Sequence, residues 1–309
     1  MKFADRLYDS IESHQSFICA GFDPVIEQFP DFLLTQTSKK TRTNEEFIEK
    51  ALTEFFFCAI DSIKDYVACI KPNIAFYEQY GLPGLSAFIS ICSYAKENGL
   101  PVIADAKRGD IGSTAQAYAS AFLGGTSLRG QQITTFAADA MTVNPFLGFY
   151  TLEVFLRAAS EHEKGLFILV RTSNPGSNDL QSVQDSEGRN ISERIADWIA
   201  SKGDELTGLK GYSGLGAVIG ATSPEIGRKL RLRMPKSLLL IPGYGAQGAG
   251  ALDAVAAFDD KKHGAVINAS RGLFGRFDAT VNSNDTLKET IKKRVDAMNL
   301  EIKDALKRA

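Results

Sequence analysis

The sequence predicts an α/β protein built as a closed (β/α)8 barrel (a TIM barrel) with an additional N-terminal helix. Short apolar runs alternate with segments of helical length along the whole chain. The eight runs are residues 17–21, 66–70, 102–104, 140–143, 166–170, 216–219, 238–241 and 265–267. Strands that alternate with helices form parallel sheets, and a count of about eight favours closure into a barrel. An open doubly wound sheet remains as an alternative, because counting strands does not prove closure.

The segments between these runs have the length of helices. They are residues 44–64, 85–98, 152–162, 191–202 and 250–259. The clearest helical pattern comes last, where an apolar face runs through a charged sequence: Leu287, Ile291, Val295, Met298 and Ile302. Apolar residues at this spacing predict an amphipathic helix that packs on the barrel.

The chain begins with a second amphipathic pattern. Phe3, Leu7 and Ile11 follow one another at four-residue steps among charged side chains. A signal peptide would carry an uninterrupted apolar core instead, so residues 1–13 predict a short helix. Two polar segments stand apart from the alternation: residues 35–44, which we expect to be a surface insertion, and residues 174–190, which we expect to be a long loop.

Composition limits the classes of function. The chain has 309 residues, 44% of them hydrophobic and 23% charged, as in an ordinary globular protein. Barrels reach this length as one unit, so we expect residues 1–309 to form a single domain. The formal charge of −2 predicts neither nucleic acid nor a membrane surface as the main partner. No apolar stretch approaches the ~20 residues that cross a bilayer, and we expect a cytoplasmic protein.

Cysteine and histidine usage narrows the chemistry further. The four cysteines, Cys19, Cys58, Cys69 and Cys92, lie in apolar segments without CxxC spacing. They resemble buried thiols of a reducing compartment and indicate neither a disulfide framework nor a zinc site. The three histidines are far apart in sequence. A histidine-rich metal site or a Ser-His-Asp triad is therefore not expected.

Polar residues collect where each predicted strand ends, which is where barrels of this kind hold their active sites. The ends in order carry Asp23; Lys71 and Asn73; Asp105, Lys107 and Asp110; Thr142 and Asn144; Ser173 and Asn174; Thr222 and Ser223; Gln247; and Arg271. Singly, each has an ordinary structural explanation, such as a helix cap, a turn or a solvated lysine. All eight ends together indicate an active site.

The end of the third strand carries the densest charge. Asp105 and Lys107 are two residues apart, so both side chains of a regular strand would point to the same side. Asp110 follows after a turn at Gly109. Such an array can keep a lysine protonated and set a carboxylate against an anionic substrate group. A salt bridge at a strand end is the alternative for this motif taken alone.

The ends of the seventh and eighth strands suit a phosphate group. Residues 243–250 form a glycine-rich loop with accessible backbone amides, Gln247 adds a neutral donor, and Arg271 adds a planar cation. Loops at these two positions often bind phosphate in barrels. The sequence therefore predicts a phosphorylated small molecule as the ligand.

Taken together, these motifs resemble the orotidine 5'-phosphate decarboxylase family. The signature is DAKRGDIG at 105–112, supported by GFDP at 21–24, KPN at 71–73, PGYGAQG at 242–248 and Arg271. KPNIAFYE at 71–78 and TVNP at 142–145 are similar to the longer, bacterial-type branch. Residues 148–150, Gly-Phe-Tyr, depart from the Gly-x-Asp of that branch, and residues 35–44 are longer than usual. The resemblance covers about 17–272.

The resemblance implies decarboxylation of orotidine 5'-monophosphate to UMP in de novo pyrimidine synthesis, without metal or organic cofactor. It assigns a charged network to Lys71, Asp105, Lys107 and Asp110, with proton delivery to C6 by Lys107. The substrate-binding residues it implies are Asp23 for ribose, Ser173 for the pyrimidine edge, Gln247 and Arg271 for phosphate, and Thr114. Asp110 and Thr114 would reach the neighbouring subunit's site, so a homodimer with shared active sites is expected.

Two other functions remain as alternatives. A sugar-phosphate lyase of the same suprafamily (a 3-keto-gulonate-phosphate decarboxylase or a hexulose-phosphate synthase) would share the Asp-x-Lys-x-x-Asp motif but use Mg²⁺ and an acidic ligand near the second strand. Here that strand ends in Lys71-Pro-Asn73, with Glu78 several residues on. The second alternative is a catalytically silent barrel that senses a nucleotide.

Overall fold

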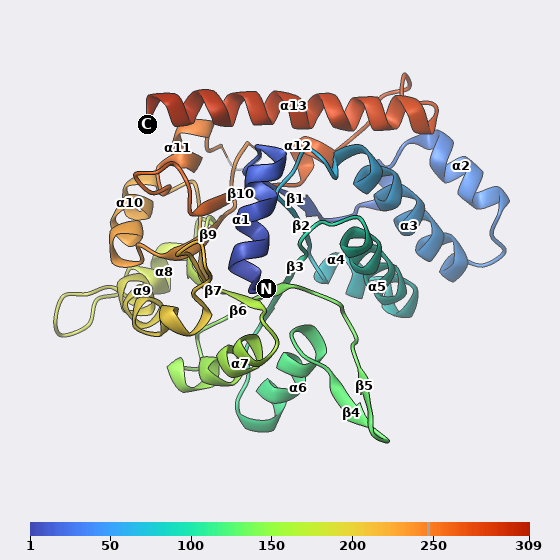
Figure 1. Ribbon diagram of the computed structural model, residues 1–309. Coiled ribbons are helices and arrows are strands. Elements are labelled where there is room, and N and C mark those ends of the chain that lie inside the picture. The colour runs from blue at the N-terminus through green and yellow to red at the C-terminus, as the bar shows by residue number, and fades with distance from the viewer. Residues whose placement is uncertain (246–247) are drawn as a thin grey trace.

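The protein forms a (β/α)8 barrel in the computed structural model, which describes residues 1–245 and 248–309 (Figure 1). Its eight-stranded sheet is parallel throughout and has the order β2-β1-β10-β9-β8-β7-β6-β3. The strands are β1 (Ile18–Phe22), β2 (Cys69–Pro72), β3 (Ile103–Arg108), β6 (Ala140–Val143), β7 (Gly165–Arg171), β8 (Ser213–Ile219), β9 (Ser237–Ile241) and β10 (Ala265–Ala269). Parallel bridges Ile70–Val102 and Asn73–Asp105 join β2 to β3, so the barrel closes as predicted.

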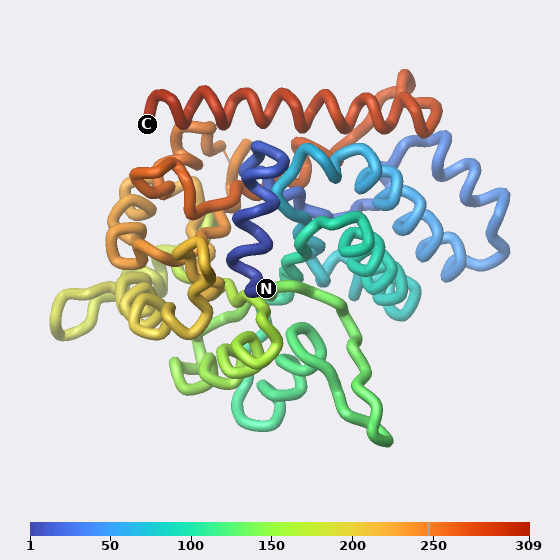
Figure 2. Tube along the Cα trace, viewed as in Figure 1, coloured from blue at the N-terminus to red at the C-terminus, as the bar shows by residue number. Residues whose placement is uncertain are grey.

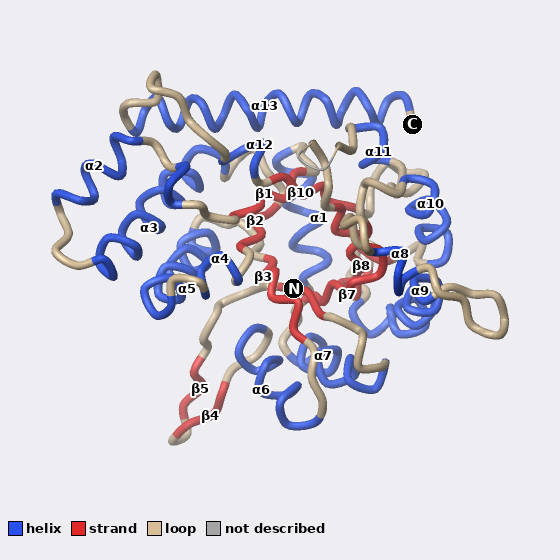
Figure 3. Tube along the Cα trace, turned by 180° about the vertical axis from the view of Figure 1, so that it is seen from behind, coloured by secondary structure: helices blue, strands red, loops and turns tan. Residues whose placement is uncertain are grey.

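Helices surround the ring of strands, as the view from behind shows (Figure 3). They are α1 (Phe3–His14), η1 (Ile26–Gln28), α2 (Asp31–Lys39), α3 (Asn44–Ile63), α4 (Ala75–Glu78), α5 (Gly81–Glu97), α6 (Gly112–Phe122), α7 (Phe149–Glu161), α8 (Ser177–Gln181), α9 (Ile191–Lys202), η2 (Gly203–Leu206), α10 (Pro224–Arg233), α11 (Ala251–Val255), α12 (Arg271–Phe274) and α13 (Asn284–Arg308). None of those within the described ranges is both long and apolar enough to cross a membrane.

The predicted N-terminal helix, α1, covers one end of the barrel (Figure 1). Phe3 packs edge-on against Phe167 of β7, with ring centroids 6.0 Å apart. The ring also lies against Gly165, where a Cβ would come within 2.2 Å of Phe3 Cδ1. A residue larger than glycine would not fit at position 165, because α1 approaches the start of β7 closely. With this amino-terminal end covered, the opposite end of the barrel, where the strands finish, carries the polar residues.

The predicted C-terminal helix, α13, extends beyond the predicted apolar positions, 287–302, at both ends. It runs along the outside of the barrel (Figure 2). Its five predicted apolar residues are all buried: Leu287, Ile291, Val295, Met298 and Ile302. At its start, Ser283 and Thr286 form a capping box, which satisfies backbone amides that a helix leaves free. The helix packs against α3 and α11.

The structure adds detail to three local expectations. Residues 35–44 lie largely at the surface, as expected, but α2 extends through them to Lys39 and buries Thr37, whose hydroxyl donates to Glu54 Oε2 at 2.9 Å. The 174–190 loop contains the short helix α8, and the predicted helix 250–259 is reduced to α11. The antiparallel hairpin of β4 (Thr126–Leu128) and β5 (Gln131–Ile133) was not predicted, because its strands are too short and too exposed to show alternation.

Candidate active site

The ends of β2 and β3 bring one carboxylate between two ammonium groups. Lys71 Nζ donates to Asp105 Oδ2 at 2.7 Å, and Lys107 Nζ donates to Asp105 Oδ1 at 2.6 Å. Asp105 and Lys71 are buried, whereas 48% of the Lys107 side chain is exposed. The buried pair therefore anchors the cluster, and Lys107 is the member that faces outward.

Burial and charge act in opposite directions on this cluster. Burial raises the pKa of the Asp105 carboxyl, but the ammonium groups of Lys71 and Lys107 outweigh that effect and hold the pKa well below its ordinary value. Burial likewise lowers the pKa of Lys71, but Asp105 and Asp23 outweigh it and raise the pKa above its ordinary value. The pair is thus ionised at neutral pH.

The strand that carries Asp105 and Lys107 is irregular where the two residues lie. The register of β3 against β6 shifts between Ala104 and Arg108, and Lys107 adopts a left-handed backbone conformation with φ of +48°. Such a φ is uncommon for a residue other than glycine and is found at functional sites. Simple alternation predicts that the two side chains meet, but it does not predict this bend in the strand.

One residue of the site was noted in the sequence without being assigned a role. Thr142 in β6 donates its hydroxyl hydrogen to Asp105 Oδ1 at 2.9 Å and accepts the backbone N–H of Lys107, also at 2.9 Å. A threonine at a strand end is common, so the sequence offered only its position as a signal. Its contacts depend on the bend in β3, which sequence reasoning did not foresee.

Asp110 and Thr114 do not join the Lys71–Asp105–Lys107 cluster within the chain. The Asp110 carboxylate accepts the backbone N–H of Ile111 at 2.8 Å, and no ion pair of this side chain is found among the described residues. Thr114 is exposed in the first turn of α6. Among the described residues, neither side chain hydrogen-bonds to Lys71, Asp105 or Lys107.

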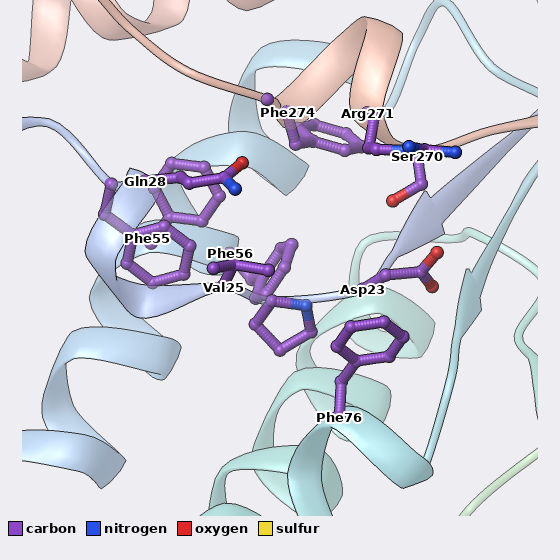
Figure 4. A pocket seen from close by; sticks show the side chains of 12 residues that line it. Asp23, Val25, Gln28, Phe55, Phe56, Phe76, Ser270, Arg271 and Phe274 are labelled. Carbon is purple, nitrogen blue, oxygen red and sulfur yellow. The ribbon is translucent and has the colours of Figure 1, made fainter. Parts of the chain in front are cut away.

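A cavity of about 300 Å³ lies between the ends of β1 and β10 (Figure 4), and it is lined by Asp23, whose charge contributes to raising the pKa of Lys71. Asp23 and Ser270 lie on one side of it, and Arg271 lies next to Ser270. Phenylalanine rings form much of the rest of the lining: Phe76 lies beside Asp23, Phe274 beside Arg271, and Phe55 and Phe56 farther from Asp23. Asp23 Oδ1 is buried and has no hydrogen-bond partner within residues 1–245 and 248–309. The cavity thus offers one carboxylate and one guanidinium to a polar ligand.

The remaining predicted residues lie on neighbouring strand ends. Ser173 follows β7, and its backbone packs so closely on β8 that a Cβ at Gly220 would lie 2.8 Å from Ser173 Cα. The loop after β9 turns through Gly243, Gly245 and Gly248, all with φ between +68° and +101°. Only glycine adopts these values readily. Gln247 lies outside the described residues.

The first acidic residue that follows β2 in the chain is already paired. Glu78 in α4 forms an ion pair with Arg108, the residue after Lys107. Both oxygens of Asp105 receive ammonium groups, as described above. Within the described part of the chain, no three His, Cys, Asp or Glu side chains are grouped in the way that would hold a metal ion.

The comparisons with known proteins agree with this arrangement. Residues 32–283 match the Orotidine 5'-phosphate decarboxylase / HUMPS family. The orotidine 5'-phosphate decarboxylase of Deinococcus radiodurans is 42% identical over 88% of this chain and 88% of its own length. That of Clostridium acetobutylicum is 36% identical over 98% of this chain and 99% of its own.

A solved structure with the same architecture supports the assignment. The OMP decarboxylase of Leishmania donovani superposes with a TM-score of 0.67 at 29% identity and covers 97% of this chain and 100% of its own. These relatives align over nearly their whole length, and the matched segment runs from α2 to the start of α13. It therefore includes every barrel strand except β1. This match, together with the coverage of the relatives, shows that this chain belongs to the orotidine 5'-phosphate decarboxylase / HUMPS family.

Proposed function

We propose that this protein decarboxylates orotidine 5'-monophosphate to UMP, with Lys107 delivering the proton to C6. The observation that carries the proposal is the buried Lys71–Asp105 pair with Lys107 on its second carboxylate oxygen. The relatives that match along most of their length bear the name of this activity.

The chemistry requires a cation beside the reacting carbon. When the bond from C6 to the carboxylate breaks, its electron pair stays on C6, and no adjacent carbonyl accepts it. A fixed ammonium next to C6 stabilises that charge in a site shielded from water. Lys107 then transfers a proton from Nζ to C6, and CO₂ leaves. The neutral amine regains its proton from solvent.

Asp105 acts on the other partner of the reaction. Its carboxylate lies against the leaving carboxylate of the substrate, so the two negative charges repel until CO₂ has formed. Lys71 keeps Asp105 in place and hydrogen-bonds a ribose hydroxyl. The energy that offsets this repulsion comes from the remote end of the nucleotide. Asp23 binds ribose, Ser173 reads the pyrimidine edge, and Gln247 and Arg271 bind phosphate.

The reaction uses no metal or organic cofactor. Its charge stabilisation comes from side chains, since Lys71 and Lys107 both donate to Asp105 and thereby take the oxygens that a divalent cation would need. Glu78, the acidic residue near β2, is held by Arg108. These contacts favour the nucleotide decarboxylase over the Mg²⁺-dependent sugar-phosphate lyases of the family.

The functional unit is a homodimer with shared sites, in which Asp110 and Thr114 complete the neighbour's active site. Asp110 is free of its own cluster, and apolar side chains are exposed around it: Ile111, Phe146, Leu147 and Tyr150. The two loops that carry them touch, because a Cβ at Gly109 would lie 2.7 Å from the Asn144 carbonyl oxygen. An exposed apolar surface of this kind is typical of a protein interface. We also propose one domain over residues 1–309 and a cytoplasmic location.

A subunit-mixing experiment tests the shared site. Asp110→Ala and Lys107→Ala homodimers are each nearly inactive, but a hybrid dimer has one site with both residues intact. With random exchange of equal amounts, half of the dimers are hybrids, so about a quarter of all sites regain activity. If mass spectrometry shows exchange and activity stays at the parental level, Asp110 acts within its own subunit.

Ultraviolet monitoring of orotidine 5'-monophosphate with the purified protein tests the function itself. We expect the substrate to be consumed with formation of UMP at equal rates in excess EDTA and in Mg²⁺. Turnover of a sugar phosphate that stops in EDTA would assign the protein to the lyases instead. Tight UMP binding without any turnover would assign it to the silent nucleotide sensors.

A further inference from the structure

A single hydroxyl joins the two charged residues of β3. Thr142 is 1% exposed, and its Oγ1 lies 2.9 Å from both the Lys107 backbone nitrogen and Asp105 Oδ1. It accepts a hydrogen bond from the first and donates one to the second. The backbone that carries the proton donor and the carboxylate that faces the substrate are therefore connected through this side chain.

The bend in β3 explains why a side chain is needed here. Ala104 pairs with Met141, and the next pair is Arg108 with Val143. On the β6 side, residues 105–107 thus face only Thr142, and the Lys107 N–H lacks the backbone carbonyl that a regular parallel ladder would supply. The Thr142 hydroxyl accepts that N–H instead. This hydrogen bond is partly buried, and a backbone donor left without a partner there would be destabilising, so the hydroxyl supports the left-handed conformation of Lys107.

The same hydroxyl fixes the rotation of the Asp105 carboxylate. Oδ1 receives both the Thr142 hydroxyl and the Lys107 ammonium, which leaves Oδ2 directed at Lys71. Threonine is branched at Cβ and has few χ1 conformations, so its hydroxyl is held in one place when the side chain is buried. Thr142 of β6 thereby fixes how the Asp105 carboxylate is oriented relative to Lys107.

We infer that Thr142 is a positioning residue for the decarboxylation, acting through Lys107 and Asp105 rather than on the substrate. The inference rests on the proposed function for its catalytic consequence. Its geometric part, that Thr142 holds the backbone at Lys107, stands apart from the identity of the substrate.

The test removes the hydroxyl and keeps the shape. Thr142→Val should lower kcat by about 10- to 100-fold, since a small displacement of a catalytic group has effects of this order. KM and the affinity for UMP should change by less than about twofold, because Thr142 does not touch the nucleotide. Thr142→Ser keeps the hydroxyl and should restore most of kcat.

A matched control is available in α2. Thr37 is also fully buried and also donates to a carboxylate, Glu54 Oε2, at 2.9 Å. Thr37→Val should lower thermal stability without changing kcat. Equal losses of kcat in the two valine variants would overturn the inference, as would a Thr142→Val enzyme with wild-type kcat or a Thr142→Ser enzyme as slow as Thr142→Val.

Amide hydrogen exchange separates this inference from the proposed function. Exchange in residues 103–108, followed by mass spectrometry, should be faster in Thr142→Val than in wild type and unchanged in Thr37→Val. If Thr142→Val does not fold, Thr142→Ala and Thr142→Ser are compared in the same way. Unchanged exchange in these residues would overturn the inference, whereas faster exchange in a protein that leaves orotidine 5'-monophosphate intact would contradict only the proposed function.

Discussion

Two buried carboxylates with cations around them lie at opposite ends of the barrel. Asp105 is 7% exposed at the carboxyl end, and Asp139 is 6% exposed just before β6, at the amino end. Asp139 Oδ1 lies 3.3 Å from Arg6 Nη2, 3.7 Å from Lys164 Nζ and 3.8 Å from Lys96 Nζ. Each cluster thus places cations around one buried carboxylate, two at Asp105 and three at Asp139.

The clusters differ in how the carboxylate is held. Asp139 Oδ2 accepts the backbone N–H of Val102 at 3.0 Å, so this oxygen stabilises the backbone just before β3. Arg6 links Asp139 to α1. Both oxygens of Asp105 instead receive side-chain donors at 2.9 Å or less, and one donor, Lys107, has a left-handed backbone. Short contacts and an unusual φ are what distinguish the Asp105 cluster, as expected of an active site, from a structural ion cluster.

The largest expected effect is the loss of Lys107, the proposed proton donor. Lys107→Ala should lower kcat for orotidine 5'-monophosphate by at least about 1,000-fold, because it removes both a general acid and a cation next to C6. UMP binding should remain detectable by calorimetry. Near-normal turnover would remove Lys107 from the mechanism and make the two clusters functionally alike.

Removing one lysine from each cluster sharpens the comparison. Lys71→Met takes a cation from a buried pair and should destabilise the fold by roughly 3 kcal/mol, together with a large loss of kcat. Lys164→Met leaves Asp139 with Arg6 and Lys96 and should cost about 1 kcal/mol or less. Urea unfolding of both variants measures the difference. Similar destabilisation would mean that the short contacts of Lys71 contribute no more to the free energy of unfolding than the longer contacts of Lys164.

The Asp139 cluster should matter for stability and hardly for rate. Asp139→Asn weakens the attachment of α1 and should lower the free energy of unfolding by about 1–2 kcal/mol. We expect kcat to stay within about twofold of wild type, since the change lies at the opposite end of the barrel from Lys107. A large fall in kcat at unchanged KM would contradict the structural role of this cluster.

The smallest effect expected is a plateau in the pH dependence of stability. Because the folded-state pKa of Asp105 is lowered, its contribution is complete above the ordinary aspartate pKa of about 4 and is lost as pH falls through the folded value. The raised pKa of Lys71 makes its contribution complete below the ordinary lysine pKa of about 10.4. The stability difference between wild type and Asp105→Asn should thus be constant from about pH 5 to about pH 9 and shrink below pH 4. A difference that changes within that range would mean that other groups control the cluster.

The sequence was sufficient for the parts of the molecule that depend on periodicity. The barrel, α1, α9 and α13 follow from regular apolar patterns, and the residues at strand ends follow from the barrel. The bend at Lys107 could not be predicted, because its cause is a register shift between two strands distant in sequence. The role of Thr142 depends on that bend. The cavity wall was missed for a similar reason, since its phenylalanines come from α3, α4 and α12.

Chemical rescue of Lys107→Ala tests most directly whether an ammonium at this position donates the proton. The Lys107 side chain is half exposed, so a small amine can reach the space that alanine leaves. Turnover of orotidine 5'-monophosphate should rise with ethylammonium concentration and not with tetramethylammonium, which carries charge but no proton to donate. Equal rescue by both ions, or rescue by neither, would contradict Lys107 as the proton donor.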